Sequence, residues 1–133
     1  MPLAVLHSFV HQTPEKTTSL TISLGDNSVF LTLSDKENKL RVKLSVDEVA
    51  GLADAVEKNK NWSAFHSFTD LSGVEKKSRI NYSQNFFNIE GEKKIAIKLG
   101  DEERISFKRV LEFAFDKLLE KKLWQGRAFE RKQ

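Results

Sequence analysis

Basic and aromatic side chains recur at strand spacing in this 133-residue sequence. Lys39, Arg41 and Lys43 alternate with apolar residues, which would place the three cations on one face of a β-strand. Lysine and arginine neutralise phosphates, while nearby aromatic rings provide flat surfaces on which unpaired bases stack. This combination of residues predicts a surface for an unpaired, negatively charged polymer.

Further residues of the same kinds lie at comparable places along the chain. Each has a structural alternative, because phenylalanine is mostly a core residue and a basic strand face can simply be solvated or discourage edge pairing. The sequence leaves both interpretations open. The predicted nucleic-acid-binding residues are Phe9, Phe68, Phe30, Phe86, His7, His66, Lys39, Arg41, Lys43, Arg79, Lys94 and Lys98.

The chain can be interpreted as two copies of one pattern. The segment Leu6-His7-Ser8-Phe9 returns as Phe65-His66-Ser67-Phe68, and Glu15-Lys16 returns as Glu75-Lys76. A duplicated unit whose turns have changed in length keeps its strands in phase. The match predicts that His7 and Phe9 share a face, as do His66 and Phe68. It also predicts that Phe30 and Phe86 lie together on the opposite face of the sheet.

Apolar and polar residues alternate with period two through each half, which predicts β-strands. A capping-box pattern follows at Ser45–Glu48 and predicts a helix that ends near Asn59. The second helix should start between Asp101 and Phe107, where 104–107 could instead be a short strand and Ser106 could be the cap. The predicted strands are 3–11, 19–24, 29–34, 39–44, 63–69, 77–83, 85–90 and 93–99.

These elements predict an α+β fold with two tandem ββββα repeats, in which antiparallel sheets pack with two helices. The repeats would span 3–61 and 62–124 within one domain, 1–133, followed by a flexible or loosely docked basic tail at 125–133. The predicted helix at 107–124 is apolar on more than one side and so needs two packing partners. We therefore expect a homo-oligomer, a dimer or larger, formed through this helix.

Composition limits the class of protein. The 22 Lys and Arg residues exceed the 19 Asp and Glu residues by three, which permits a nucleic-acid partner without requiring one. Cysteine is absent, so the chain has neither disulfides nor thiolate metal ligands. No segment approaches transmembrane length, and the N-terminal apolar run is short and lacks a basic lead. We expect an intracellular protein with no membrane partner.

Catalysis has weaker support in the sequence. Asp70 with Glu92-Lys93-Lys94 resembles the acidic residues and lysine of metal-dependent nucleases, but Glu-Lys-Lys occurs three times in this chain and carries little information. His7 and His66 lack a third metal ligand nearby in sequence, and the chain has no glycine-rich phosphate loop. We predict a protein without catalytic activity, cofactor or metal.

The segment Leu40-Arg41-Val42-Lys43-Leu44-Ser45-Val46-Asp47-Glu48-Val49 joins a basic strand to a serine-capped helix. Together with the tandem strand order, it resembles the Whirly, Pur-alpha and positive-cofactor-4 group of single-stranded nucleic-acid-binding proteins. The resemblance implies a sheet that binds single-stranded DNA or RNA, and helices that pack repeats or protomers together. The Lys-Gly-Lys-Ala motif of plant Whirly proteins is absent, so no residue role is transferred. The alternative is an oligomeric assembly or interaction protein without a nucleic-acid ligand.

Overall fold

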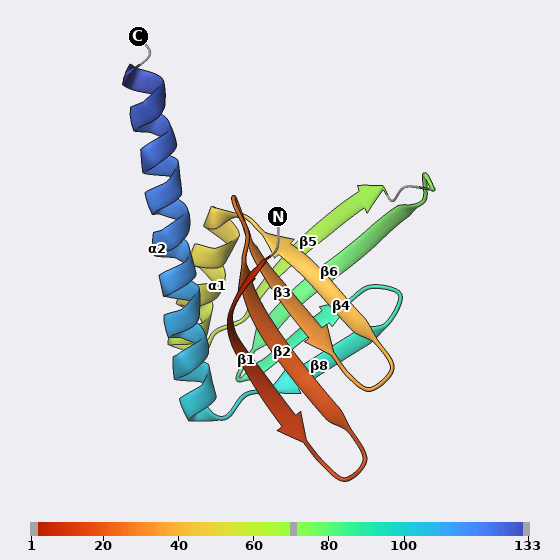
Figure 1. Ribbon diagram of the computed structural model, residues 1–133. Coiled ribbons are helices and arrows are strands. Elements are labelled where there is room, and N and C mark those ends of the chain that lie inside the picture. The colour runs from red at the N-terminus through yellow and green to blue at the C-terminus, as the bar shows by residue number, and fades with distance from the viewer. Residues whose placement is uncertain (1–2, 70–71, 132–133) are drawn as a thin grey trace.

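The computed structural model describes residues 3–69 and 72–131, without the side chains of 68, 69 and 122–131. Four strands and a helix are followed by four more strands and a second helix (Figure 1). The first five elements are β1 (Ala4–Gln12), β2 (Thr17–Leu24), β3 (Val29–Ser34), β4 (Lys39–Leu44) and α1 (Val46–Lys58). The others are β5 (Trp62–Thr69), β6 (Glu75–Ser83), β7 (Phe86–Glu90), β8 (Lys94–Lys98) and α2 (Asp101–Arg131).

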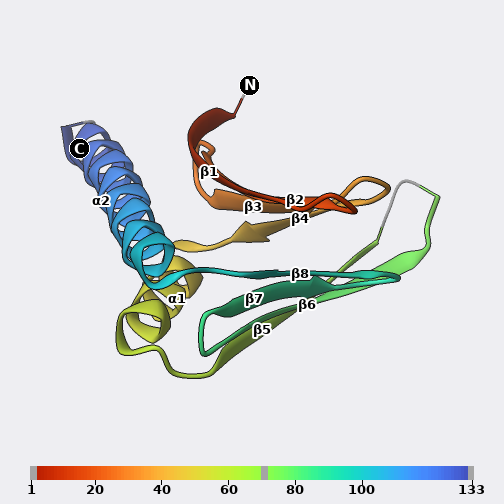
Figure 2. The same ribbon diagram turned by 90° about the horizontal axis from the view of Figure 1, so that it is seen from below.

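The strands form two antiparallel sheets, each in the order of the chain. We refer to β1–β4 as sheet A and to β5–β8 as sheet B. Figure 2 shows the sheets as two layers, with both helices at one end of the pair. The predicted α+β class, with two antiparallel four-stranded sheets and two helices, is confirmed.

Local sequence signals explain where α1 begins and ends. The Ser45 backbone N–H donates to Glu48 at 3.0 Å, and the Glu48 backbone N–H donates to the Ser45 hydroxyl at 3.3 Å. This reciprocal pair satisfies two amides that the first helical turn leaves unpaired. Asn59 ends the helix in the left-handed conformation, with φ of 52°. Both predicted limits of α1 are confirmed.

Helix α2 is longer than predicted. It starts at Asp101, so 104–107 is helical and Ser106 is not the cap. Its backbone continues through 125–131, for which the sequence predicts a loose tail. That segment contains no proline and consists largely of residues that tolerate a helix, so the preceding turns can propagate into it. Among the described residues, neither helix combines the length and apolarity needed to cross a membrane.

The core lies between the two sheets and beneath the helices. Phe107 of α2 packs edge-on against Phe9 of sheet A and Phe87 of sheet B, with ring centroids 6.1 and 5.7 Å apart. One side of α2 is buried through Phe107, Leu111, Ala114 and Leu118. Val110 and Phe115 are partly buried against this core. Three other apolar residues of its described part, Ile105, Phe113 and Leu119, are exposed among charged side chains.

The strand registers show which positions of the two sheets correspond. In sheet A, Phe9 pairs with Leu20 and His11 with Thr18, whereas in sheet B, Ala64 pairs with Ile80 and His66 with Ser78. The last strand of each sheet, β4 or β8, leads into a helix, and the two sheets can be aligned at that point. When the pairings are then followed strand by strand, His66 corresponds to His11, and Ala64 corresponds to Phe9. The sequence match of His7 with His66 and of Phe9 with Phe68 is wrong by four residues. The tetrapeptides resemble each other without occupying equivalent places.

Candidate nucleic-acid interface

The outer face of sheet A carries a row of cations along β4. Lys39, Arg41 and Lys43 are exposed, and within the described residues none of them forms an ion pair with a carboxylate. Arg41 is oriented by its neighbour, because Nε donates to the hydroxyl of Thr32 at 3.0 Å. Phe30 pairs across the ladder with Lys43 and thus lies on the same face. Positive charge and one aromatic ring are therefore adjacent here, as predicted.

The outer face of sheet B carries exposed aromatic rings. Phe65 is 58% exposed and Phe86 is 48% exposed. Phe65 pairs with the exposed Arg79 across the ladder, and the ammonium of Lys98 lies 5.5 Å from the centre of the Phe86 ring. Lys94 is nearby in the sheet but is 3.3 Å from the carboxylate of Glu90. This face therefore offers aromatic surfaces for stacking. Two of its cations already interact within the protein, Lys98 with the Phe86 ring and Lys94 with Glu90.

Several predicted contacts require correction. Phe9 is only 5% exposed and belongs to the core, because its strand position faces Leu20 and the Phe107 ring. His7 is exposed but lies against Phe9, with ring centroids 4.6 Å apart, on the side of sheet A that faces the core. Phe30 and Phe86 do not lie together, since they occupy the outer faces of different sheets. The side chain of Phe68 lies outside the described residues.

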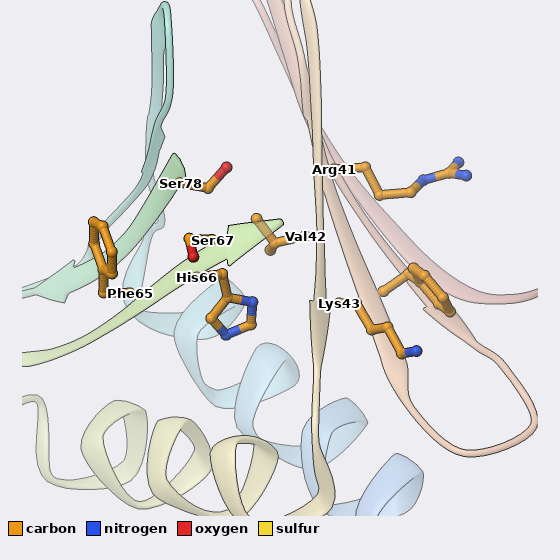
Figure 3. Close-up of a pocket in the computed structure, with 8 residues that line it drawn as sticks. Arg41, Val42, Lys43, Phe65, His66, Ser67 and Ser78 are labelled. Atoms are coloured by element: carbon orange, nitrogen blue, oxygen red, sulfur yellow. The ribbon is translucent and has the colours of Figure 1, made fainter. Parts of the chain in front are cut away.

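A groove of about 590 Å³ joins parts of these surfaces at the edge of β4. Figure 3 shows His66 and Ser78 of sheet B pointing toward β4, where Val42 points back toward them. Arg41 and Lys43 project from the opposite side of β4, and the ring of Phe65 points away from the groove beyond β5. Its lining residues are Phe30, Arg41, Val42, Lys43, Phe65, His66, Ser67 and Ser78.

A second cavity adjoins this groove. This cavity, of about 410 Å³, shares Phe30 and Lys43 with the first. It continues past the turn between β2 and β3 to Lys121 of α2, whose ammonium donates to the carbonyl of Gly25 at 3.2 Å. The shared residues make one continuous path from the edge of sheet B, over β4, to the long helix. Such a path suits an extended chain better than a compact ligand.

Two histidine–glutamate pairs connect the halves of the molecule in a crossed arrangement. Glu48, which starts α1 after sheet A, binds His66 of sheet B at 2.5 Å. Glu103, which starts α2 after sheet B, binds His11 of sheet A at 2.8 Å. Because the two histidines occupy corresponding positions, each helix is attached to the sheet of the other half. The pair with Glu48 also fixes the ring of His66, which lines the groove.

Both glutamates have a lowered pKa. Burial acts to raise the pKa of Glu48, but hydrogen bonds with the His66 ring and the Ser45 backbone N–H outweigh it. Burial likewise opposes the shift at Glu103, where hydrogen bonds with the Gly100 backbone N–H and the His11 ring lower the pKa. The ordinary value is 4.5 for both groups, so both carboxyls are ionised at neutral pH. Each therefore presents a negative charge to its histidine.

The groove includes residues that the sequence prediction missed. Phe65 could have been predicted from strand alternation, because a strand whose Trp62 and Ala64 side chains face inward must have Phe65 facing outward. Val42 and the two serines, Ser67 and Ser78, have no such signal, since their role depends on how the sheets approach each other. Asp70, considered for nuclease chemistry, lies outside the described residues. In the described part of the chain, no three His, Asp or Glu residues are placed to hold a metal ion.

Comparison with known proteins identifies no relative. No protein-family model matches the sequence, and a search of curated proteins finds no similar chain. The function is therefore inferred from the geometry of the site itself.

Proposed function

We propose that this chain is a non-catalytic protein that binds single-stranded DNA or RNA along the path through the groove at β4. The observation that carries the proposal is the convergence at this edge of two cations, Arg41 and Lys43, with Phe30, beside the polar groove residues of sheet B. The cations have no carboxylate partner among the described residues, so they are available to phosphates. The exposed rings of Phe65 and Phe86 provide further stacking surfaces on sheet B.

The architecture gives additional support by analogy. Four antiparallel strands and a helix, repeated once, are the arrangement of the Whirly-like group, whose sheets bind unpaired strands. We propose that the chain shares this architecture and this class of ligand. Fold alone does not imply function, so the analogy adds to the argument from the groove and does not replace it.

Titration of the purified protein with labelled oligonucleotides tests the proposal. We expect a single strand to bind more tightly than a duplex of the same length, because a duplex hides the base faces that stack on aromatic rings. Affinity should fall between two salt concentrations as bound counterions are released. Equal affinity for both forms, or no binding at low salt, would contradict the proposal.

A second candidate function is assembly without a nucleic-acid ligand. The observation in its favour is the exposure of Phe113 (50%) and Leu119 (43%) on the described part of α2. These two side chains would pack against a second copy of the chain, as the predicted oligomerisation through 107–124 requires. Light scattering at micromolar concentration separates the cases. If the wild-type protein and Phe113→Glu both have the mass of a single chain, the exposed residues of α2 no longer support assembly.

A further inference from the structure

The space between the sheets changes character at the β4 edge. On the inner face of sheet B, two successive cross-strand rows are apolar: Trp62 with Tyr82, and Ala64 with Ile80. The next row consists of His66 and Ser78, both partly exposed, opposite Val42 of sheet A (Figure 3). A small hydroxyl and a polar ring stand where the pattern of the preceding rows would place apolar side chains. They border the part of the 590 Å³ groove that opens between the sheets, and the rest of the groove extends over the outer residues of the β4 edge.

We propose that this groove receives one base of the bound strand and reads its polar edge. The inference rests on the proposed function and adds base preference to it. The volume falls within the roughly 300–1,000 Å³ that is usual for ligand pockets. Val42 supplies an apolar wall, and the hydroxyl of Ser78 can donate or accept a hydrogen bond. These are the groups that a flat ring with donors and acceptors on its edge requires.

His66 is held ready for such a contact. Its Nε2 is bound to Glu48, which fixes the ring, while Nδ1 has no hydrogen-bond partner among the described residues. The ring points from β5 toward β4 (Figure 3). A base that enters the groove can therefore stack on this imidazole or bond to Nδ1. The second interaction would use a polar atom that the described part of the chain leaves without a hydrogen-bond partner.

The charges around the groove favour a nucleotide over other occupants. Arg41 and Lys43 flank Val42 in β4, so an inserted base would have its neighbouring phosphates beside these cations. Bases before and after it would lie near the rings of Phe30 and Phe65, which border the groove. Unpaired strands are recognised in this way, by stacking combined with hydrogen bonds to base edges.

Homopolymers of equal length, in DNA and RNA form, test the inference by fluorescence anisotropy at one salt concentration. We expect the preferred base to bind about tenfold more tightly than the poorest one, the discrimination that good edge contacts provide. Ser78→Leu should fill the groove and abolish the preference while leaving the salt dependence intact. Ser83→Leu is the matched control, because Ser83 lies in the same strand, is exposed and does not line the groove.

A second measurement uses the wild-type protein, so it does not depend on the folding of a variant. Mononucleotides are titrated while the imidazole resonances of His66 are followed by NMR, with His7 as the internal control. Shifts confined to His66 support the inference. Three results would overturn the inference while leaving single-strand binding intact. They are affinities for the homopolymers that agree within twofold, a base preference that Ser78→Leu retains, and imidazole resonances of His66 that do not shift. Absence of any strand binding would instead overturn the proposed function, and the inference with it.

Discussion

The two sheets share one strand order and matching registers, but their outer faces differ in chemistry. Sheet A presents hydroxyls bonded to one another across strands, as in Ser8 with Thr21 at 2.9 Å and Ser19 with Ser34 at 2.7 Å. Its cations lie in a row along β4. Sheet B presents exposed phenylalanines, and one of its lysines, Lys94, is paired with Glu90.

Under the proposed function, this difference would divide the contacts with a bound strand between the two halves. The β4 cations of sheet A, which have no carboxylate partner in the described part of the chain, suit the phosphates of a strand, and the exposed rings of sheet B suit its bases. The two outer faces point in opposite directions (Figure 2), so a single strand can use both only at an edge where the sheets meet. The groove at β4 is such an edge, because its lining comes from both sheets.

The largest expected effect separates a core phenylalanine from an exposed one. Phe9→Ala removes a 5% exposed ring that packs on Phe107 and should lower the free energy of unfolding by about 3–5 kcal/mol. Urea unfolding measures this loss. The fraction that remains folded should bind single strands with unchanged affinity. If Phe9→Ala is as stable as the wild type but binds single strands more weakly, Phe9 contacts the ligand and is not a core residue.

Phe65→Ala should show the opposite behaviour. The ring is 58% exposed, so its removal should leave thermal stability nearly unchanged. Binding to a single strand should weaken by about 1–3 kcal/mol if a base stacks on this ring. Calorimetric titration with a short oligonucleotide provides the measurement, and Val10→Ala, another exposed apolar change but on sheet A, is the control. Equal losses in both variants would mean that the aromatic ring has no special role.

Much of the fold could be predicted because its signals are local. Period-two alternation located all eight described strands, and the Ser45–Glu48 capping box located the start of α1. The extent of α2 could not be predicted as well, because the sequence at 125–131 has no strong stop signal and its weak helix propensity is decided by the preceding turns. Local signals of this kind say little about how the elements pack.

The candidate site was harder to predict because it depends on register. The tetrapeptide match made Phe9 equivalent to Phe68. The strand pairings instead show that the position in sheet B equivalent to Phe9 is Ala64. A register change between Val5 and His7 in β1 adds a further local irregularity that alternation alone does not reveal. The cations of β4 needed only strand period to be assigned to one face. The serines of the groove became recognisable only once the two sheets were placed together.

Arg41, which has no carboxylate partner among the residues that the structure describes, can be compared with Lys94, which is paired with Glu90. Arg41→Ala should reduce the slope of log affinity against log salt by about 0.7, the value for one phosphate contact on a single strand. Lys94→Ala should change the slope less, because Glu90 already neutralises part of its charge from 3.3 Å. Titrations at four salt concentrations supply both slopes. Identical slopes in the two variants would remove the distinction between the sheets.

The smallest effect concerns the crossed histidine–glutamate pairs, which join the two halves symmetrically although their outer faces differ. Glu48 and Glu103 have a pKa below the ordinary 4.5, so the folded protein binds their protons more weakly than the unfolded chain does. Their contribution to stability is therefore present above about pH 4.5 and is lost as the pH falls through the lowered value. Partly exposed pairs of this kind contribute about 0.2–1 kcal/mol each.

Glu48→Gln isolates the charge, since glutamine can still close the capping box with Ser45. In urea unfolding between pH 7 and pH 3, the stabilities of the wild type and of Glu48→Gln should draw closer as the pH falls, because the wild-type carboxyl becomes increasingly protonated. Glu103→Gln should converge in the same way. Asp47→Asn is the matched variant, because it removes an exposed carboxylate from the same first turn without touching the pair with His66. Curves for Glu48→Gln that stay parallel to the wild type down to pH 3 would show that the attachment of α1 to sheet B does not depend on this charge.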